Sequence, residues 1–100
     1  MKKWKIALAW KIEFDTDVEK DLKKLGHSAQ KRIFKYLKEQ VIPAEDPRSF
    51  GKPLSGNLSG LWRYRVGDYR IISKIEDNHF IINLLLIYIC TEQNLHRFFM

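Results

Sequence analysis

Two short turn motifs divide the C-terminal half of the chain and restrict its fold more than any other feature. Gly67-Asp68 and Asp77-Asn78 separate three runs that are rich in β-branched and aromatic residues. These runs span residues 61–66, 69–75 and 80–89. Such runs, joined by two-residue turns, pair as antiparallel hairpins, and a glycine in first place favours a type II′ turn. The sequence therefore predicts a three-stranded antiparallel meander.

Two helical patterns precede the meander. Their apolar stripes consist of Val18, Leu22 and Leu25, and of Ala29, Ile33, Leu37 and Val41. Thr16, followed three residues later by Glu19, is a capping box, and Gly26 is typical of a helix end. Ser28 is expected to cap the second helix, which runs to about Val41 before Pro43 terminates it. Two antiparallel helices with so short a link form a helical hairpin.

An alternating run near the start of the chain predicts one further strand. Trp10, Ile12 and Phe14 share one face of the run W-K-I-E-F. The element order is then strand, helix, helix and three strands, which is typical of an α+β fold with both helices on one face of the sheet. We therefore expect an N-terminal strand, a two-helix hairpin and a three-stranded meander that completes a roughly four-stranded sheet.

The domain organisation is simple, because no linker or low-complexity segment divides the 100 residues. A single domain is predicted over residues 1–100. Residues 1–9 are interpreted as an N-terminal extension or an alternative start of the first strand, and residues 91–100 as an atypical tail. The stretch from Pro43 to Gly60 contains all three prolines and is expected to be a loop.

The chain is basic, with a formal net charge of +6 and an isoelectric point near 9.6. This charge favours a polyanionic partner, either nucleic acid or an acidic protein. The apolar part of MKKWKIALAW is too short for a secretory signal. The run 81–89 is far shorter than the about 20 residues that a membrane helix needs. We expect a soluble cytoplasmic protein with no membrane partner.

Cysteine and histidine are sparse. Cys90 is the only cysteine, so an internal disulfide is excluded. No C-x-x-C or clustered His/Cys spacing indicates a metal site, so we expect neither a metal nor another cofactor. His27 and His79 are interpreted as surface residues.

Three arginines in the run LWRYRVGDYRIISKI are the candidate functional residues. Arg63 and Arg65 share one strand face, because residues two apart point to the same side. The Gly67-Asp68 turn places Arg70 opposite Arg65 on that face. Directly opposed like charges are unfavourable, so the cluster indicates either compensating carboxylates or a phosphate target. Trp62, Tyr64 and Tyr69 point to the other side and are expected in the core.

Further basic residues lie outside this hairpin. Lys52, in the preceding loop, is a candidate RNA contact. Lys31, Arg32 and Lys35 are expected on the outer face of the second helix. They would bind RNA phosphates or form a solvated helical face, and the pattern alone does not choose between these readings.

Several blocks of the sequence, between about Trp10 and Ile89, resemble the RelE family of toxins from toxin–antitoxin systems. The weaker blocks are W-K-I-E-F, V-E-K-D-L-K-K-L and Q-K-R-I-F-K-Y-L. The specific ones are D-P-R-S-F-G-K-P-L-S-G followed by L-W-R-Y-R-V-G-D-Y-R-I-I. The resemblance implies a RelE-like fold of the microbial ribonuclease type.

The resemblance also implies an activity and partners. Such toxins cleave messenger RNA in the ribosomal A site without a metal, by attack of a 2′-OH on the adjacent phosphate. Arg63, Arg65 and Arg70 match the family residues that hold and activate that phosphate. The implied partners are the ribosome, its mRNA and a cognate acidic, RelB-like antitoxin. Operator DNA is an implied partner of the toxin–antitoxin complex only.

The C-terminal tail departs from the family pattern near H-R-x-x-[I/V]-Y. Thr91 and Glu92 stand where histidine and arginine are expected, and His96 stands at the tyrosine position. A carboxylate at that position repels a phosphate. His96 is interpreted either as a surface histidine of the tail or as the candidate replacement for the general acid, since histidine titrates near neutral pH. We therefore expect the fold and the arginines to be kept and the nuclease activity to be attenuated.

Two alternatives stay open. One is a ParE-like toxin, which shares the fold but inhibits gyrase. The other is a catalytically inert homologue that binds its antitoxin.

Overall fold

The structure, a computed structural model, describes residues 10–90. The expectations for residues 1–9 and 91–100, including His96, lie outside the described residues. The strands are β1 (Lys11–Phe14), β2 (Lys52–Pro53), β3 (Trp62–Val66), β4 (Tyr69–Glu76) and β5 (Ile81–Ile89). The helices are α2 (Thr16–Leu25) and α3 (His27–Tyr36), and a π-helical turn, Leu37–Val41, extends α3. Short 3-10 turns span Pro47–Phe50, Gly56–Leu58 and Asp77–His79.

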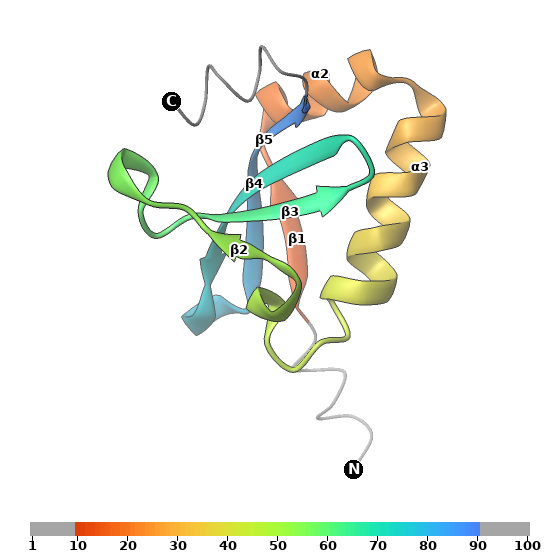
Figure 1. Ribbon diagram of the computed structural model, residues 1–100. Coiled ribbons are helices and arrows are strands. Elements are labelled where there is room, and N and C mark those ends of the chain that lie inside the picture. Colours follow the sequence, from red (N-terminus) through yellow and green to blue (C-terminus); the bar gives the residue numbers. More distant parts are fainter. Residues whose placement is uncertain (1–9, 91–100) are drawn as a thin grey trace.

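The strands form a single sheet in the order β1-β5-β4-β3-β2. Strands β3, β4 and β5 pair as the predicted antiparallel meander, and β1 lies parallel to β5 at the other edge (Figure 1). The sheet has five strands rather than about four, because β2 adds a two-residue pairing to β3. The stretch expected to be entirely loop therefore contains β2, whose backbone becomes a strand only by pairing with β3.

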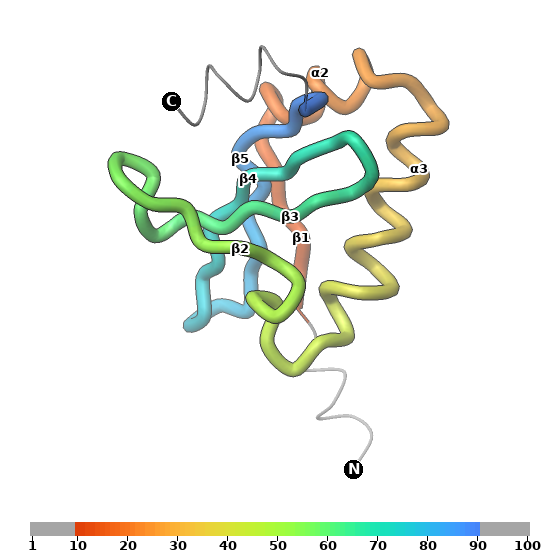
Figure 2. The backbone as a smooth tube through the Cα atoms, viewed as in Figure 1, coloured from red at the N-terminus to blue at the C-terminus, as the bar shows by residue number. Residues whose placement is uncertain are grey.

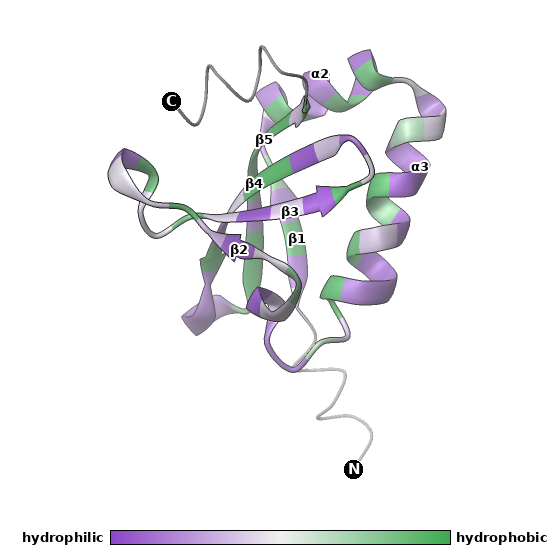
Figure 3. Cartoon of the chain, in the orientation of Figure 1, coloured by the Kyte–Doolittle hydropathy of each residue, from purple (hydrophilic) through white to green (hydrophobic). Residues whose placement is uncertain are grey.

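Both helices cover the same face of the sheet, as predicted for this α+β fold (Figure 1). The apolar stripes of the helices pack against the sheet, and hydrophilic residues alternate with them along both helices (Figure 3). The core formed between them contains Val18, Leu22, Ile33, Leu37, Val41, Tyr64, Ile71, Ile82, Leu84 and Ile87. Trp62 and Tyr69 are partly buried against this core, so their predicted orientation is confirmed.

The two predicted helix N-caps are displaced by one or two residues, whereas the predicted end of the first helix at Gly26 is confirmed. Asp15, not Thr16, caps α2, since its Oδ1 accepts a hydrogen bond from the Val18 N–H at 3.0 Å. Ser28 lies within α3, which begins at His27 without a side-chain cap. Gly26 has a φ of 91°, which favours glycine, and it ends α2 and starts α3 within one residue. No room is left for a separate serine cap.

The β3–β4 turn has the predicted geometry. Gly67 has a φ of 59°, and Asp68 is not among the residues with a positive φ. A positive φ at the first position alone distinguishes a type II′ turn from type I′. Figure 2 follows this tight turn to its tip, which lies beside α3. In the next turn Phe80 takes a left-handed φ of 54°, and β5 therefore begins at Ile81.

Candidate nucleic-acid interface

The sheet face opposite the helices carries two rows of basic residues. Cross-strand register places Lys52 opposite Arg63, and Arg63 opposite Ile72. The neighbouring row contains Arg65 opposite Arg70, and Arg70 opposite Tyr88. We call this surface the arginine face, defined by Lys52, Arg63, Arg65, Arg70 and Tyr88. The predicted register of Arg65 and Arg70 is confirmed.

Strand alternation explains why these residues gather there. Tyr64 and Val66 of β3 point into the core, with exposed fractions of 0% and 7%. Arg63 and Arg65 must then point to the opposite side. Arg63 is half-buried and Arg65 is exposed, so guanidinium groups at two depths line the face.

Arg65 and Arg70 differ in how firmly they are held. Arg70 Nη1 donates hydrogen bonds to the Gly67 carbonyl at 2.9 Å and to the Tyr69 carbonyl at 3.0 Å. These bonds fix Arg70 against its own turn through one of its three guanidinium nitrogens. Within residues 10–90, no carboxylate forms an ion pair with Arg65 or Arg70. The compensating carboxylates that the sequence left open as an alternative are therefore absent for these two arginines within that range.

Tyr88 is a member of the arginine face that sequence reasoning missed. It is buried, and burial raises the pKa of its phenol, although the positive charges of Arg63 and Arg70 oppose that rise. The phenol is therefore protonated near neutral pH. Strand alternation in β5 predicts which face of the sheet Tyr88 occupies. Its place opposite Arg70 follows only from the register between β4 and β5.

Apolar side chains also lie on the arginine face, next to its charged groups. Ile72 is buried and Leu86 is half-buried, and the two lie opposite each other on β4 and β5. Charges beside apolar groups interact more strongly than charges surrounded by water, because the effective dielectric constant is lower there. Ile72 and Leu86 therefore strengthen the attraction of this face for an anion.

The segment before Lys52 is anchored at two points. Inside, the buried Tyr64 hydroxyl donates a hydrogen bond to the Pro47 carbonyl at 2.8 Å. Outside, Arg48 binds Asp77, and its guanidinium lies 5.7 Å from the centroid of the Trp62 ring. These contacts hold the chain where β2 can pair with β3, so Lys52 lies next to Arg63.

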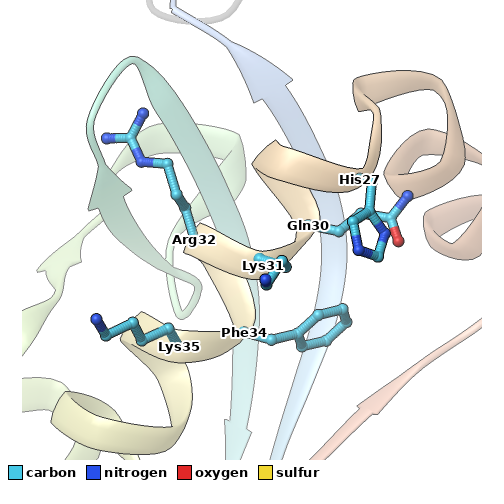
Figure 4. Close-up of a pocket in the computed structure, with 6 residues that line it drawn as sticks. All are labelled: His27, Gln30, Lys31, Arg32, Phe34 and Lys35. Carbon is cyan, nitrogen blue, oxygen red and sulfur yellow. The ribbon is translucent and has the colours of Figure 1, made fainter.

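The basic residues of α3 lie apart from the arginine face. Lys31, Arg32 and Lys35 are exposed on the outer surface of the helix. With His27, Gln30 and Phe34 they line an open groove of about 440 Å³ (Figure 4). Arg32 reaches the tip of the β3–β4 hairpin, since a Cβ added at Gly67 would collide with its guanidinium. His79, like His27, is exposed.

The described residues contain neither a metal-binding cluster nor a membrane-spanning helix. No group of three or more His, Cys, Asp or Glu side chains within residues 10–90 could hold a metal ion. In the same range no helix has the length and apolarity to cross a membrane.

Comparison with known families gives this geometry a context. The family model "ParE toxin of type II toxin-antitoxin system, parDE" matches residues 12–92, most of the chain. The chain belongs to this family of toxins, within the RelE/ParE superfamily.

Known relatives of this RelE/ParE toxin are also toxins. It is 27% identical over 78 residues to Toxin RelG of Mycobacterium tuberculosis, covering 78% of this chain and 87% of RelG. It is 40% identical over 40 residues to Toxin RelE of the same organism, covering 40% of this chain and only 41% of that relative.

A solved structure resembles the whole toxin fold. The RelBE2 toxin–antitoxin complex of M. tuberculosis contains a chain with a TM-score of 0.73 and 26% identity. The match covers 82% of this chain and 99% of that one. This chain is a toxin of a type II toxin–antitoxin system with the RelE-like α+β fold.

Proposed function

We propose that this toxin is a ribosome-dependent endoribonuclease that cleaves mRNA in the A site without a metal. The observation that supports this proposal most directly is the arrangement of Arg65 and Arg70. They are directly opposed on adjacent strands, beside Arg63 and Lys52, and neither has a carboxylate partner within residues 10–90. Such mutual repulsion is relieved when a phosphate binds between the charges.

The proposed reaction needs cations at the phosphate. The 2′-OH attacks the adjacent phosphorus, the P–O5′ bond breaks, and the products are a 2′,3′-cyclic phosphate and a 5′-OH. The pentavalent intermediate carries extra negative charge, which guanidinium groups in fixed positions stabilise. Arg63, Arg65 and Arg70 take this role, and Lys52 binds the neighbouring backbone.

Proton transfer is the other requirement of the reaction. The 2′-OH must lose a proton to a base, and the leaving O5′ must gain one. Burial raises the pKa of the Tyr88 phenol, so the phenol is protonated near neutral pH and we do not propose it as the base. His96 is the candidate acid, and Glu92, at the position where the family resemblance implies an arginine, would weaken activity by repelling the phosphate. We therefore propose that cleavage is slow and relies on ribosomal groups for part of this proton transfer.

The proposed inhibitor is an acidic, RelB-like antitoxin. Two observations support it: the net charge of +6, and the similarity to the toxin chain of the RelBE2 toxin–antitoxin complex. An acidic chain complements this charge. The toxin would act in the cytoplasm, and it would reach operator DNA only as part of the complex.

The deciding experiment is cleavage of mRNA on purified ribosomes, mapped by primer extension. The wild type should give cuts at A-site codons, and Arg65→Ala combined with Arg70→Ala should lower the rate by about a hundredfold. Lys24→Ala, which removes one exposed charge from α2, is the control and should cleave normally. Cuts of equal strength from the double variant would refute the role of the arginines.

A gyrase-inhibiting, ParE-like activity is the second candidate, and the ParE description of the matching family model supports it. That activity predicts altered DNA supercoiling and intact mRNA. If the wild type leaves both mRNA and supercoiling unchanged but captures its antitoxin, the third hypothesis, an inert binding homologue, would hold.

A further inference from the structure

Two arginines approach the β3–β4 turn from opposite faces of the sheet. Arg70, on the arginine face, donates a hydrogen bond to the Gly67 carbonyl at 2.9 Å. Arg32 reaches the same glycine from α3, on the helix-covered face. Positive charge therefore continues around the tip of this hairpin instead of ending at the edge of the sheet.

Beyond Arg32 lies a second groove of about 320 Å³, between α3 and the exposed edge of β3. We call it the edge groove. It is lined by Arg32, Lys35, Tyr36, Glu39, Gln40 and Val66. Among residues 10–90 no strand pairs with this part of the edge, because β2 ends its pairing at Trp62 and Arg63. Since Val66 lines the groove, its neighbour Arg65 stands at the border between the two surfaces.

The lining of the edge groove combines the groups that bind a nucleotide. Arg32 and Lys35 are exposed cations three residues apart on α3, which places them on one helical face. Tyr36 offers a half-buried aromatic ring and is oriented by a hydrogen bond from its hydroxyl to the Phe50 carbonyl at 3.4 Å. Burial raises the pKa of Tyr36, so its phenol adds no negative charge. Gln40 can donate and accept hydrogen bonds.

One carboxylate, Glu39, also lines the edge groove. It follows Lys35 by one helical turn, so it partly compensates the lysine. The groove keeps an excess of positive charge, because Arg32 has no carboxylate ion pair within residues 10–90.

We propose that an RNA strand held on the arginine face continues around the β3–β4 hairpin into the edge groove. Arg32 and Lys35 bind a phosphate that flanks the bound linkage, and Tyr36 and Gln40 contact its nucleotide. The inference rests on the proposed RNA substrate but not on cleavage. In this proposal Arg32 and Lys35 of α3 bind the same RNA strand as the three arginines. The ligand is then single-stranded RNA that is longer than the dinucleotide at the cleavage site.

The test measures RNA binding with cleavage blocked. Two fluorescent, fully 2′-O-methylated single strands serve as probes: a trinucleotide, which is short enough to occupy the arginine face alone, and a nonanucleotide. Fluorescence anisotropy then compares the wild type with Lys35→Ala, Gln40→Ala and Arg65→Ala over a range of salt concentrations. Lys24→Ala removes an equal charge elsewhere and serves as the control.

The expected result depends on probe length. Lys35→Ala should weaken binding of the nonanucleotide and leave the trinucleotide unchanged, while Arg65→Ala weakens both. The slope of log K against log salt for the nonanucleotide should fall by about 0.7, the value of one phosphate contact on a single strand. Gln40→Ala, which changes no charge, should lower nonanucleotide affinity without changing that slope.

Three results would overturn the edge groove as an RNA site. One is unchanged nonanucleotide binding by Lys35→Ala and Gln40→Ala while Arg65→Ala loses both probes, which leaves the proposed function intact. Another is an equal loss in Lys24→Ala, which reduces the effect to overall charge. The third is a groove that binds polyglutamate in a Lys35-dependent way but not RNA, which makes it a surface for an acidic protein.

Discussion

Arg48 binds Asp77 through both ends of its guanidinium, with Nη1–Oδ1 at 2.9 Å and Nη2–Oδ2 at 2.6 Å. The pair joins the 3-10 turn Pro47–Phe50 to the β4–β5 turn, across 29 residues of sequence. Arg48 also contacts Asp46 at 3.4 Å and lies over Trp62. The contacts position the segment that ends at Lys52, so a residue outside the arginine face controls part of its geometry.

Arg48→Ala should release this segment while the core stays folded. The bidentate pair and the stacking on Trp62 are lost together, and the pairing of β2 with β3 loosens. We expect a melting temperature lowered by a few degrees and faster hydrogen exchange at the Leu54 N–H, which bonds the Leu61 carbonyl. Arg48→Lys keeps the charge without the bidentate geometry and should give an intermediate effect. Unchanged exchange at Leu54 in both variants would contradict the anchoring role.

The Arg48–Asp77 pair should also make stability depend on pH. The hydrogen bond from Arg48 lowers the pKa of the Asp77 carboxyl in the folded state. As the pH falls, Asp77 of the unfolded chain takes up a proton before Asp77 of the folded chain does. The stabilisation is therefore complete above about pH 4, which is the ordinary pKa of an aspartate side chain. It is lost as the pH falls below that value through the lowered pKa. Urea unfolding of the wild type and Asp77→Asn should differ near neutral pH and converge in acid. A constant difference down to the most acidic pH would exclude the linkage.

Tyr64→Phe should destabilise the whole domain. The Tyr64 side chain is fully buried, and its hydroxyl donates to the Pro47 carbonyl at 2.8 Å. Without the hydroxyl that carbonyl has lost its partner, at a cost of about 1–3 kcal/mol in the free energy of unfolding. Tyr69→Phe, at a half-buried tyrosine on the same side of the sheet, is the matched control and should change stability less. Equal urea midpoints for the wild type and Tyr64→Phe would show that the bond contributes nothing.

Alanine at Arg65 and at Arg70 should have different effects on stability. Arg65 is exposed, so its replacement should leave the free energy of unfolding within about 0.5 kcal/mol of the wild type. Arg70 holds its turn through two backbone carbonyls, so its replacement should lower stability as well as RNA binding. Denaturant unfolding and anisotropy on the same samples separate the two effects. If both variants lose equal stability, the hydrogen bonds of Arg70 do not hold the turn.

Gly67→Ala should strain the hairpin for two reasons. The φ of 59° costs an L-residue about 1 kcal/mol. The new Cβ would also collide with the Arg32 guanidinium. Adding Arg32→Ala removes the collision but not the backbone strain, so the double variant should recover part of the lost stability. A double-mutant cycle measures this coupling, and additive effects would argue against the contact.

Local patterns were sufficient for the order of both helices and of four of the five strands, and for one critical register. Hydrophobic periodicity predicted both helices and the meander, because the period of each pattern reports which face is buried. The Gly67-Asp68 turn predicted that Arg65 lies opposite Arg70, since a two-residue hairpin loop leaves no freedom in the pairing next to it. Local rules were wrong at the helix N-caps, where Asp15 and Gly26 took the positions assigned to Thr16 and Ser28. Several neighbouring residues could cap the free N–H groups at each helix N-terminus. Which residue does so depends on how the helices pack against the sheet.

The partners of the arginines depended on contacts between distant segments. Lys52 reaches Arg63 only because Tyr64 and Arg48 anchor the preceding turn. Tyr88 joins Arg70 through a register that shifts between Ile72 and Ser73, and Arg32 meets the hairpin only when α3 docks on the sheet. No local pattern encodes such pairs, since each depends on how separate elements pack against a shared core. The β3–β4 hairpin and its arginines were thus predictable from the sequence, whereas tertiary packing determined which side chains surround those arginines.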